Sequence, residues 1–143
     1  MRTYRRLAGW LLLAIPLVAF GGTSILRLVI SDPAYIENEL RRDLWAAGHA
    51  HAGVLLVLSL VMLRYAEEVE LPSIPRYFAA HGVPLAAIFI PAAMFLSVLD
   101  GEATEPNGLI NLAYVGAISL LLGTASLAIG LLRRGEEAQT IRT

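Results

Sequence analysis

Hydrophobic residues are gathered into four long blocks along the chain, and short polar connections separate the blocks. The blocks run over about residues 7–30, 44–63, 78–99 and 110–132. A helix needs roughly 20 apolar residues to cross a bilayer core of about 30 Å, and each block is long enough. The pattern predicts an all-α fold, with residues 1–143 forming one domain made of four transmembrane helices. The Asp32-Pro33 pair predicts a further short helix in the first connection, at the membrane surface.

Arginines are distributed unevenly between the two ends of the predicted helices, and this distribution predicts the orientation. The excess of arginines marks the cytoplasmic side, so both termini are expected in the cytoplasm of a multi-pass protein of the inner membrane. One side carries Arg2, Arg5, Arg6, Arg64, Arg76, Arg133, Arg134 and Arg142, and the other carries Arg27, Arg41 and Arg42.

Composition excludes several classes of site and partner. Hydrophobic residues make up 57% of the 143 residues, a share above the usual range of soluble domains. The chain has no cysteine, so it has neither disulfides nor thiolate metal ligands. No basic stripe of the kind that follows a phosphate backbone is present, so no nucleic-acid partner is expected. The lipid bilayer is the expected environment.

Small residues form one face of the fourth predicted helix, because they recur at spacings of three and four. Such a face lets two helix backbones approach closely. We favour packing within the chain, and an interface between copies of the chain is the alternative. The face consists of Gly116, Ser119, Gly123, Ser126 and Gly130.

Two of the three histidines lie in "LWAAGHAHAGVLL", within the second predicted helix. Ionisable groups at such depth are costly and usually have a partner. His49 and His51 lie about 200° apart around a helix, so they cannot chelate one ion together. His81 lies four residues into the third predicted helix, which starts on the opposite side of the membrane. Its level therefore differs from that of His49 by about 15–20 Å. His51 shares a face with Leu55 and Leu58, which is typical of a histidine that packs in the core or supports a ligand from behind.

Trp45, His49 and Gly53 recur every four residues and therefore share one face of the second helix. An aromatic ring on one side of His49 and a residue without a side chain on the other would leave a slot for a planar macrocycle. Haem iron commonly takes one axial histidine. Arg41 and Arg42 lie about two turns outward and could pair with haem propionates. The alternative is an ordinary interfacial histidine, hydrogen-bonded to a neighbour or to lipid headgroups.

The first 60 residues resemble the styrene oxide isomerase family, a group of small four-helix membrane proteins distantly similar to the catalytic subunit of haem-copper oxidases. The segments that carry the resemblance are "RRLAGW", "AFGG" and "LWAAGHAHAG". The family has a Trp followed four residues later by its haem-ligating His, and this spacing selects His49 after Trp45. An alternative alignment on His-x-Gly selects His51, which Gly53 follows.

The resemblance implies a homotrimer with haem b between subunits, in which the iron acts as a Lewis acid and opens a small apolar epoxide to an aldehyde. The chain departs from the family pattern at two places. The family has an Asn six residues after its ligand, where this chain has Leu55, or Val57 if His51 is the ligand. The family also has an acid and a Tyr within its third helix, whereas residues 78–99 contain neither Asp nor Tyr. Asn111 and Tyr114, which open the fourth helix at nearly the depth of His49, are candidate catalytic substitutes. They are equally typical of interfacial anchors.

The leading hypothesis from the sequence is therefore a haem b protein of the isomerase-like class, with His49 as axial ligand. The first alternative is a haem protein for electron transfer or gas sensing. The second is a cofactor-free structural or partner-binding membrane protein.

Overall fold

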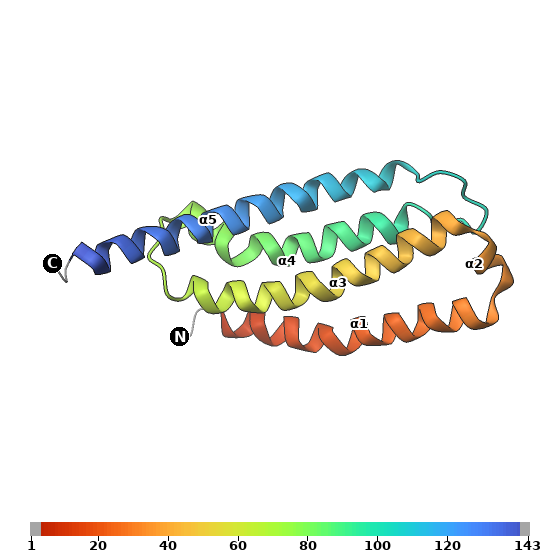
Figure 1. Cartoon of the computed structure of the whole chain (residues 1–143), viewed down its shortest axis with the longest axis horizontal. Coiled ribbons are helices and arrows are strands. Elements are labelled where there is room, and N and C mark those ends of the chain that lie inside the picture. The colour runs from red at the N-terminus through yellow and green to blue at the C-terminus, as the bar shows by residue number, and fades with distance from the viewer. Residues whose placement is uncertain (1–3, 141–143) are drawn as a thin grey trace.

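The computed structural model describes residues 4–140, with side chains to residue 134, and these residues contain helices but no strand. The bundle comprises four long helices, α1, α3, α4 and α5, joined through a five-residue helix, α2, and a 3-10 turn, η1 (Figure 1). The all-α prediction is confirmed for this part of the chain. The bounds are α1 Arg5–Ser31, α2 Pro33–Glu37, α3 Glu39–Ala66, α4 Ser73–Leu96, η1 Gly108–Asn111 and α5 Leu112–Thr140.

Polar caps and prolines determine where the helices begin. Asp32 accepts a hydrogen bond from the backbone N–H of Tyr35 at 3.2 Å, and Pro33 fills the first helical position, so α2 begins where the sequence predicted it. Asn38 caps α3 by accepting from the N–H of Arg41 at 3.0 Å. Pro72 precedes α4 and Pro75 lies in its first turn, where no intrahelical N–H is needed.

The helices do not have the same bounds as the apolar blocks, because capping residues and turns, rather than hydropathy, determine where a helix begins and ends. Helix α3 begins five residues before the apolar block at 44, since the polar stretch after Asn38 is helical too. Helix α4 begins five residues before the block at 78 and ends at Leu96, three residues before the block does. The chain then turns, and the backbone N–H of Asn107 donates to the carbonyl of Ser97 at 2.9 Å.

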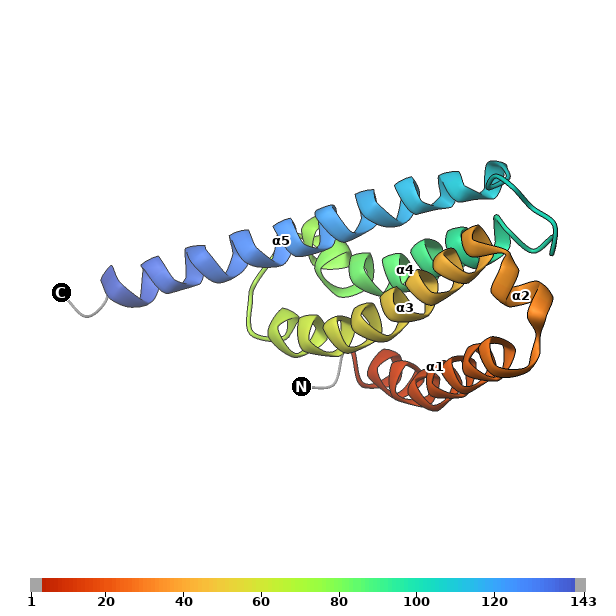
Figure 2. The ribbon, with the colours of Figure 1, turned by 45° about the vertical axis from the view of Figure 1, so that its right-hand side comes forward.

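The long helices lie side by side in the order α1, α3, α4, α5 (Figures 1 and 2). Helix α4 packs closely on both α3 and α5, whereas α1 contacts α3 and the short α2. The start of α1 and the end of α5 lie at the same end of the bundle, and α5 projects beyond its neighbours there. Helix α1 is therefore the least enclosed of the four.

Glycines let α4 and α5 approach closely. A Cβ on Gly82 would lie 2.5 Å from the carbonyl oxygen of Ser119 and 2.7 Å from Cα of Gly123. A Cβ on Gly116 would lie 2.5 Å from Cγ1 of Ile90. The small-residue face of α5 thus packs against α4 in the same chain, which confirms the favoured interpretation of that face.

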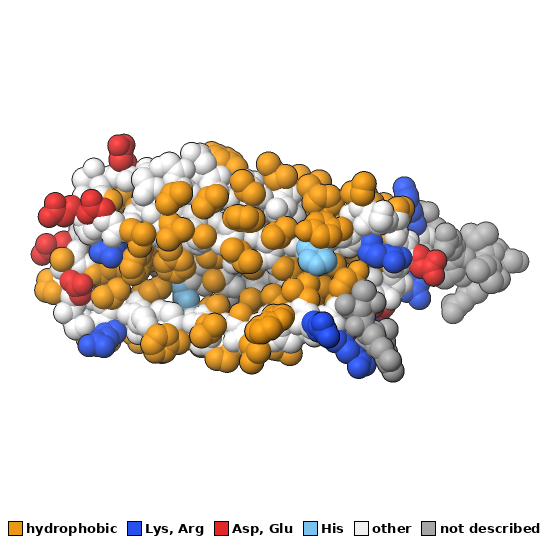
Figure 3. Space-filling view, turned by 180° about the vertical axis from the view of Figure 1, so that it is seen from behind, with side chains coloured by type: hydrophobic (Ala, Val, Ile, Leu, Met, Phe, Trp, Pro, Cys, Tyr) orange, Lys and Arg blue, Asp and Glu red, His pale blue; other side chains and the backbone are white. Residues whose placement is uncertain are grey.

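An apolar surface covers the middle of the bundle, and charged side chains gather at its two ends (Figure 3). Helices α1, α3 and α4, together with the segment Gly108–Arg134, are each long and apolar enough to cross a membrane. The chain thus has the organisation of a multi-pass membrane protein.

Candidate functional site

The side chain of His49 projects from α3 onto α1, at a position where α1 has no side chain. A Cβ built on Gly22 would lie 2.6 Å from Nε2 and 2.8 Å from Cε1 of the His49 ring. Real Cβ atoms do not approach this closely, so glycine is required at position 22 for the ring to occupy this place. One turn along the same face, a Cβ on Gly53 would contact Val18 at 4.0 Å. The slot expected beside His49 is therefore covered by α1.

Trp45 is part of an aromatic cluster at the end of the bundle near α2. Its ring centroid lies 5.8 Å from that of Tyr35 and 5.8 Å from that of Phe95. The guanidinium carbon of Arg41 lies 4.5 Å from the Trp45 centroid, in a cation–π contact. Trp45 is thus half-buried and packs against α2 and α4, and it does not line an open slot beside His49.

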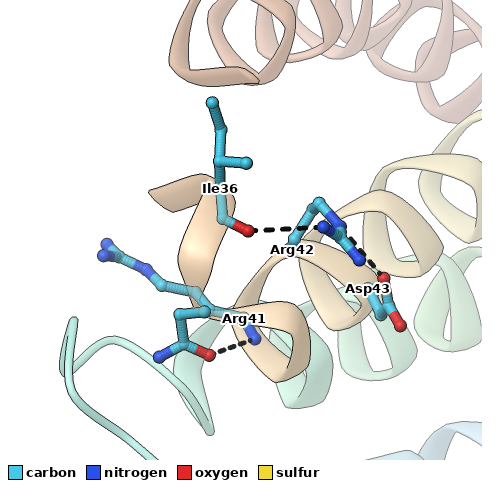
Figure 4. Close-up of polar contacts among 5 residues, drawn as sticks. Ile36, Arg41, Arg42 and Asp43 are labelled. Atoms are coloured by element: carbon cyan, nitrogen blue, oxygen red, sulfur yellow. Dashed lines mark hydrogen bonds and ion pairs between the residues drawn. The ribbon is translucent and has the colours of Figure 1, made fainter. Parts of the chain in front are cut away.

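Arg41 and Arg42 point in opposite directions from the start of α3 (Figure 4). Arg42 donates to the carbonyl of Ile36 at 3.3 Å and pairs with Asp43 at 3.4 Å. Arg41 lies over Trp45 instead. The structure does not bring the two guanidinium groups together as one propionate-binding pair.

Tyr35 is the most deeply buried member of the aromatic cluster, with 1% of its surface exposed. Its hydroxyl, Nε of Arg41 and Nε1 of Trp45 are buried and have no hydrogen-bond partner within the described residues. Burial raises the pKa of Tyr35 above its usual 10.0, while the charges of Arg41 and Arg42 oppose the shift. The phenol therefore stays protonated at neutral pH.

His51 is exposed on the surface of α3, and it is not packed between Leu55 and Leu58 as the sequence indicated. Its Nδ1 lies 2.8 Å from the carbonyl oxygen of Ala47. Because a carbonyl can only accept, Nδ1 carries the proton in the neutral ring, and Nε2 is left with a free lone pair. Metal-ligating histidines are commonly held by such a hydrogen bond from the second ring nitrogen.

His81 shows a similar local arrangement on α4. Its Nδ1 lies 3.0 Å from the carbonyl of Tyr77, and the Tyr77 ring stacks on the imidazole at 4.5 Å and 14°. The described residues contain no group of three or more His, Cys, Asp or Glu side chains that could hold a metal ion. The three histidines thus form three separate environments.

Asn111 and Tyr114 lie at the start of α5. The amide of Asn111 donates to the carbonyl of Gly108 at 3.0 Å and so stabilises η1. Tyr114 is 70% exposed. Within the described residues α5 packs mainly on α4, and its contact with α3, the helix that carries His49, is slight.

Two residues important to this region were not singled out from the sequence. Gly22 occurs in "AFGG", but nothing local indicates that it faces His49. Asn38 could have been found, since an Asn before a helical run is a typical N-cap. Its amide also donates to the carbonyls of Gly101 and Ala103, at 2.8 and 3.1 Å, and so holds the loop before α5 against α3.

Comparisons of the chain with protein-family models, with curated proteins and with solved structures found no match.

Proposed function

We propose that this chain is an integral protein of the cytoplasmic membrane that binds haem b through one histidine of α3. Four apolar helices provide the membrane domain. The arginine-rich ends, including both termini, face the cytoplasm under the positive-inside rule. The resemblance of "LWAAGHAHAG" to the styrene oxide isomerase family supports the choice of cofactor.

His51 is the axial ligand in this proposal, and the observation that carries it is the hydrogen bond from Nδ1 to Ala47. That bond fixes the tautomer and orientation of the ring and leaves Nε2 free on an exposed part of α3. His49 fits less well, because its Nε2 lies against the backbone of Gly22 and a macrocycle has no room there. The alternative alignment on His51 and Gly53 therefore agrees better with the geometry than the alignment on Trp45 and His49.

An exposed ligand suits a haem that is shared between copies of the chain. The α3 surface around His51 is apolar, with Ala50, Val54 and Val57 all exposed. A haem bound there would have one face against α3, and a second copy would cover the other. This arrangement requires a homo-oligomer, and the resemblance to the styrene oxide isomerase family favours a trimer.

The proposed reaction class is the isomerisation of a small apolar epoxide to an aldehyde. A haem with one protein ligand supplies a Lewis-acidic position for the epoxide oxygen when it is bound. Residues of this chain would contribute the apolar surroundings that exclude water. Tyr114 is exposed and could reach such a site only in a neighbouring copy, and Asn111 would first have to leave Gly108.

The test is the haem content of three matched variants, measured as the pyridine haemochromogen after purification from haem-sufficient cells. His51→Ala should lose most of the haem, whereas His49→Ala and His81→Ala should keep it. Loss of haem in His49→Ala alone would show that His49, and not His51, is the axial ligand. Full haem in both α3 variants would contradict ligation by α3.

A further inference from the structure

An open groove with a volume of about 480 Å³ lies along the last part of α1. Four of its five lining residues have polar side chains, although α1 is long and apolar enough to cross a membrane. The volume falls within the range of about 300–1,000 Å³ that is typical of small-molecule sites. Charged side chains in such a helix usually have a partner and indicate a functional site. The lining consists of Ser24, Arg27, Leu28, Ser31 and Asp32.

The groove opens on the side of α1 that faces away from α3. Gly22 of α1 faces His49 of α3. At about 100° per residue, Arg27 lies about 140° around α1 from Gly22, and Ser31 lies about 180° around. Both of these side chains are exposed, and the elements that contact α1 are α3 and the short α2. The described part of the chain therefore leaves this side of α1 to the surrounding lipid.

The groove lies at the level where lipid headgroups are expected. It covers about the last two turns of α1, which ends at Ser31, and charged side chains gather at this end of the apolar surface (Figure 3). Towards the middle of the bundle, the same side of α1 continues with exposed apolar side chains, Phe20, Leu17 and Leu13. A lipid whose headgroup occupies the groove would thus have its acyl chains against an apolar surface.

The groove contains one positive and one negative side chain, and they do not pair with each other. No hydrogen bond or ion pair of the Arg27 guanidinium is found within the described residues, although it has five N–H donors. Asp32 accepts a hydrogen bond from the N–H of Tyr35 through one oxygen, and its other oxygen has no partner in this part of the chain. A ligand can therefore meet a free guanidinium and a free carboxylate oxygen in the same groove.

The two serine hydroxyls of the groove can only accept a hydrogen bond from a ligand. Ser24 and Ser31 donate to carbonyls of their own helix, at 2.9 and 2.7 Å, and this uses the single proton of each hydroxyl. A ligand must therefore offer acceptor oxygens to Arg27 and N–H or O–H donors to Asp32 and the serines. Arg27 and Asp32 are five residues apart, or about 7.5 Å along the helix axis. A phosphate that is joined through two carbons to a protonated amine has the required groups and charges.

We propose that this groove binds the headgroup of phosphatidylethanolamine. The guanidinium of Arg27 donates charge-assisted hydrogen bonds to the phosphate, and the ammonium group donates to Asp32 and to the serine oxygens. Phosphatidylglycerol has the phosphate but no positive charge for Asp32. Phosphatidylcholine has the positive charge but no N–H to donate. The site lies on the side of α1 that is turned away from α3, so it does not depend on the haem proposed at His51.

The experiment measures lipid binding to the delipidated full chain in detergent by native mass spectrometry, with the three phospholipids present in equal amounts and with identical acyl chains. The wild type should bind phosphatidylethanolamine about 5-fold more tightly than the other two, which is the effect of one hydrogen bond of ordinary net strength. Arg27→Gln should weaken the binding of all three lipids, because all three carry the phosphate. Asp32→Asn should weaken phosphatidylethanolamine alone, and it keeps the cap of α2 because Asn caps a helix as well as Asp does.

Two matched controls each remove one charge outside the groove. Arg76→Gln and Glu105→Gln should keep the preference for phosphatidylethanolamine, and circular dichroism checks that every variant is folded. A wild type that prefers phosphatidylglycerol or phosphatidylcholine, or that shows no preference, overturns the proposal. So does a preference that persists in folded Asp32→Asn, or lipid binding that folded Arg27→Gln leaves unchanged. Displacement of the lipid by free phosphoethanolamine at the same concentration would also overturn it, because the ligand would then be a soluble molecule.

Discussion

Replacing Gly82 by alanine should force α4 and α5 apart. The added Cβ would lie 2.5 Å from the carbonyl oxygen of Ser119, 2.7 Å from Cα of Gly123 and 2.9 Å from its nitrogen. Non-bonded carbon atoms prefer about 3.5–4.0 Å, so the two backbones must separate by about 1 Å. All three contacts are with backbone atoms, and rotation of a side chain cannot relieve them.

The expected cost follows from two opposing effects. Overpacking of this kind costs about 1–3 kcal/mol, with severe backbone contacts at the upper end. Alanine recovers up to about 1 kcal/mol over glycine in a helix. We therefore expect Gly82→Ala to destabilise the bundle by about 2 kcal/mol.

Unfolding in mixed micelles, with the fraction of dodecyl sulfate raised and helicity followed by circular dichroism, measures this effect. Gly9→Ala in α1 is the matched control, because a Cβ there meets nothing within 4 Å. The control should be neutral or slightly stabilising. If Gly82→Ala unfolds at the same point as Gly9→Ala, the close crossing of α4 and α5 is wrong.

Two further predictions concern the end of the bundle near α2. Asn38→Ala removes a helix cap and two hydrogen bonds to the loop before α5, and should lower the free energy of unfolding by about 1–2 kcal/mol, in the same micelle titration; no loss would contradict this role of the loop contacts. Because the pKa of Tyr35 is raised on folding, the unfolded chain releases its proton first, so stability should fall as pH rises through about 10. Tyr35→Phe should remove that part of the pH dependence without loss of stability at neutral pH, since the buried hydroxyl has no partner; a wild-type slope that persists in the variant would refute the assignment.

The membrane organisation could be predicted from the sequence because it depends on block length and composition, which are local properties. That the small-residue face of α5 packs within the chain could also be predicted, because its small residues recur at helical spacing, but the sequence did not indicate that α4 is its partner. Which neighbouring helices cover each side of α3 could not be predicted. Spacing places Trp45 and His49 on one face, but α1 covers His49 while α2 and α4 surround Trp45.

The same limit explains the different placement of His51. Its neighbours at helical spacing, Leu55 and Leu58, indicated packing, since apolar residues usually face a core. Leu55 is buried and Leu58 packs against the same core cluster, whereas His51 is exposed, so sharing a helix face with core residues does not by itself bury a side chain. The hydrogen bond between Nδ1 and the carbonyl of Ala47 becomes evident only when the backbone is present.

The absorption spectrum of the purified wild-type protein, oxidised and reduced, tests the central claim most directly. One histidine ligand predicts a b-type haem that is dominated by the high-spin, five-coordinate form, with a reduced spectrum that shifts when carbon monoxide is added. A folded, helical protein that is colourless after purification from haem-sufficient cells would contradict the account, and so would a clean low-spin bis-histidine spectrum.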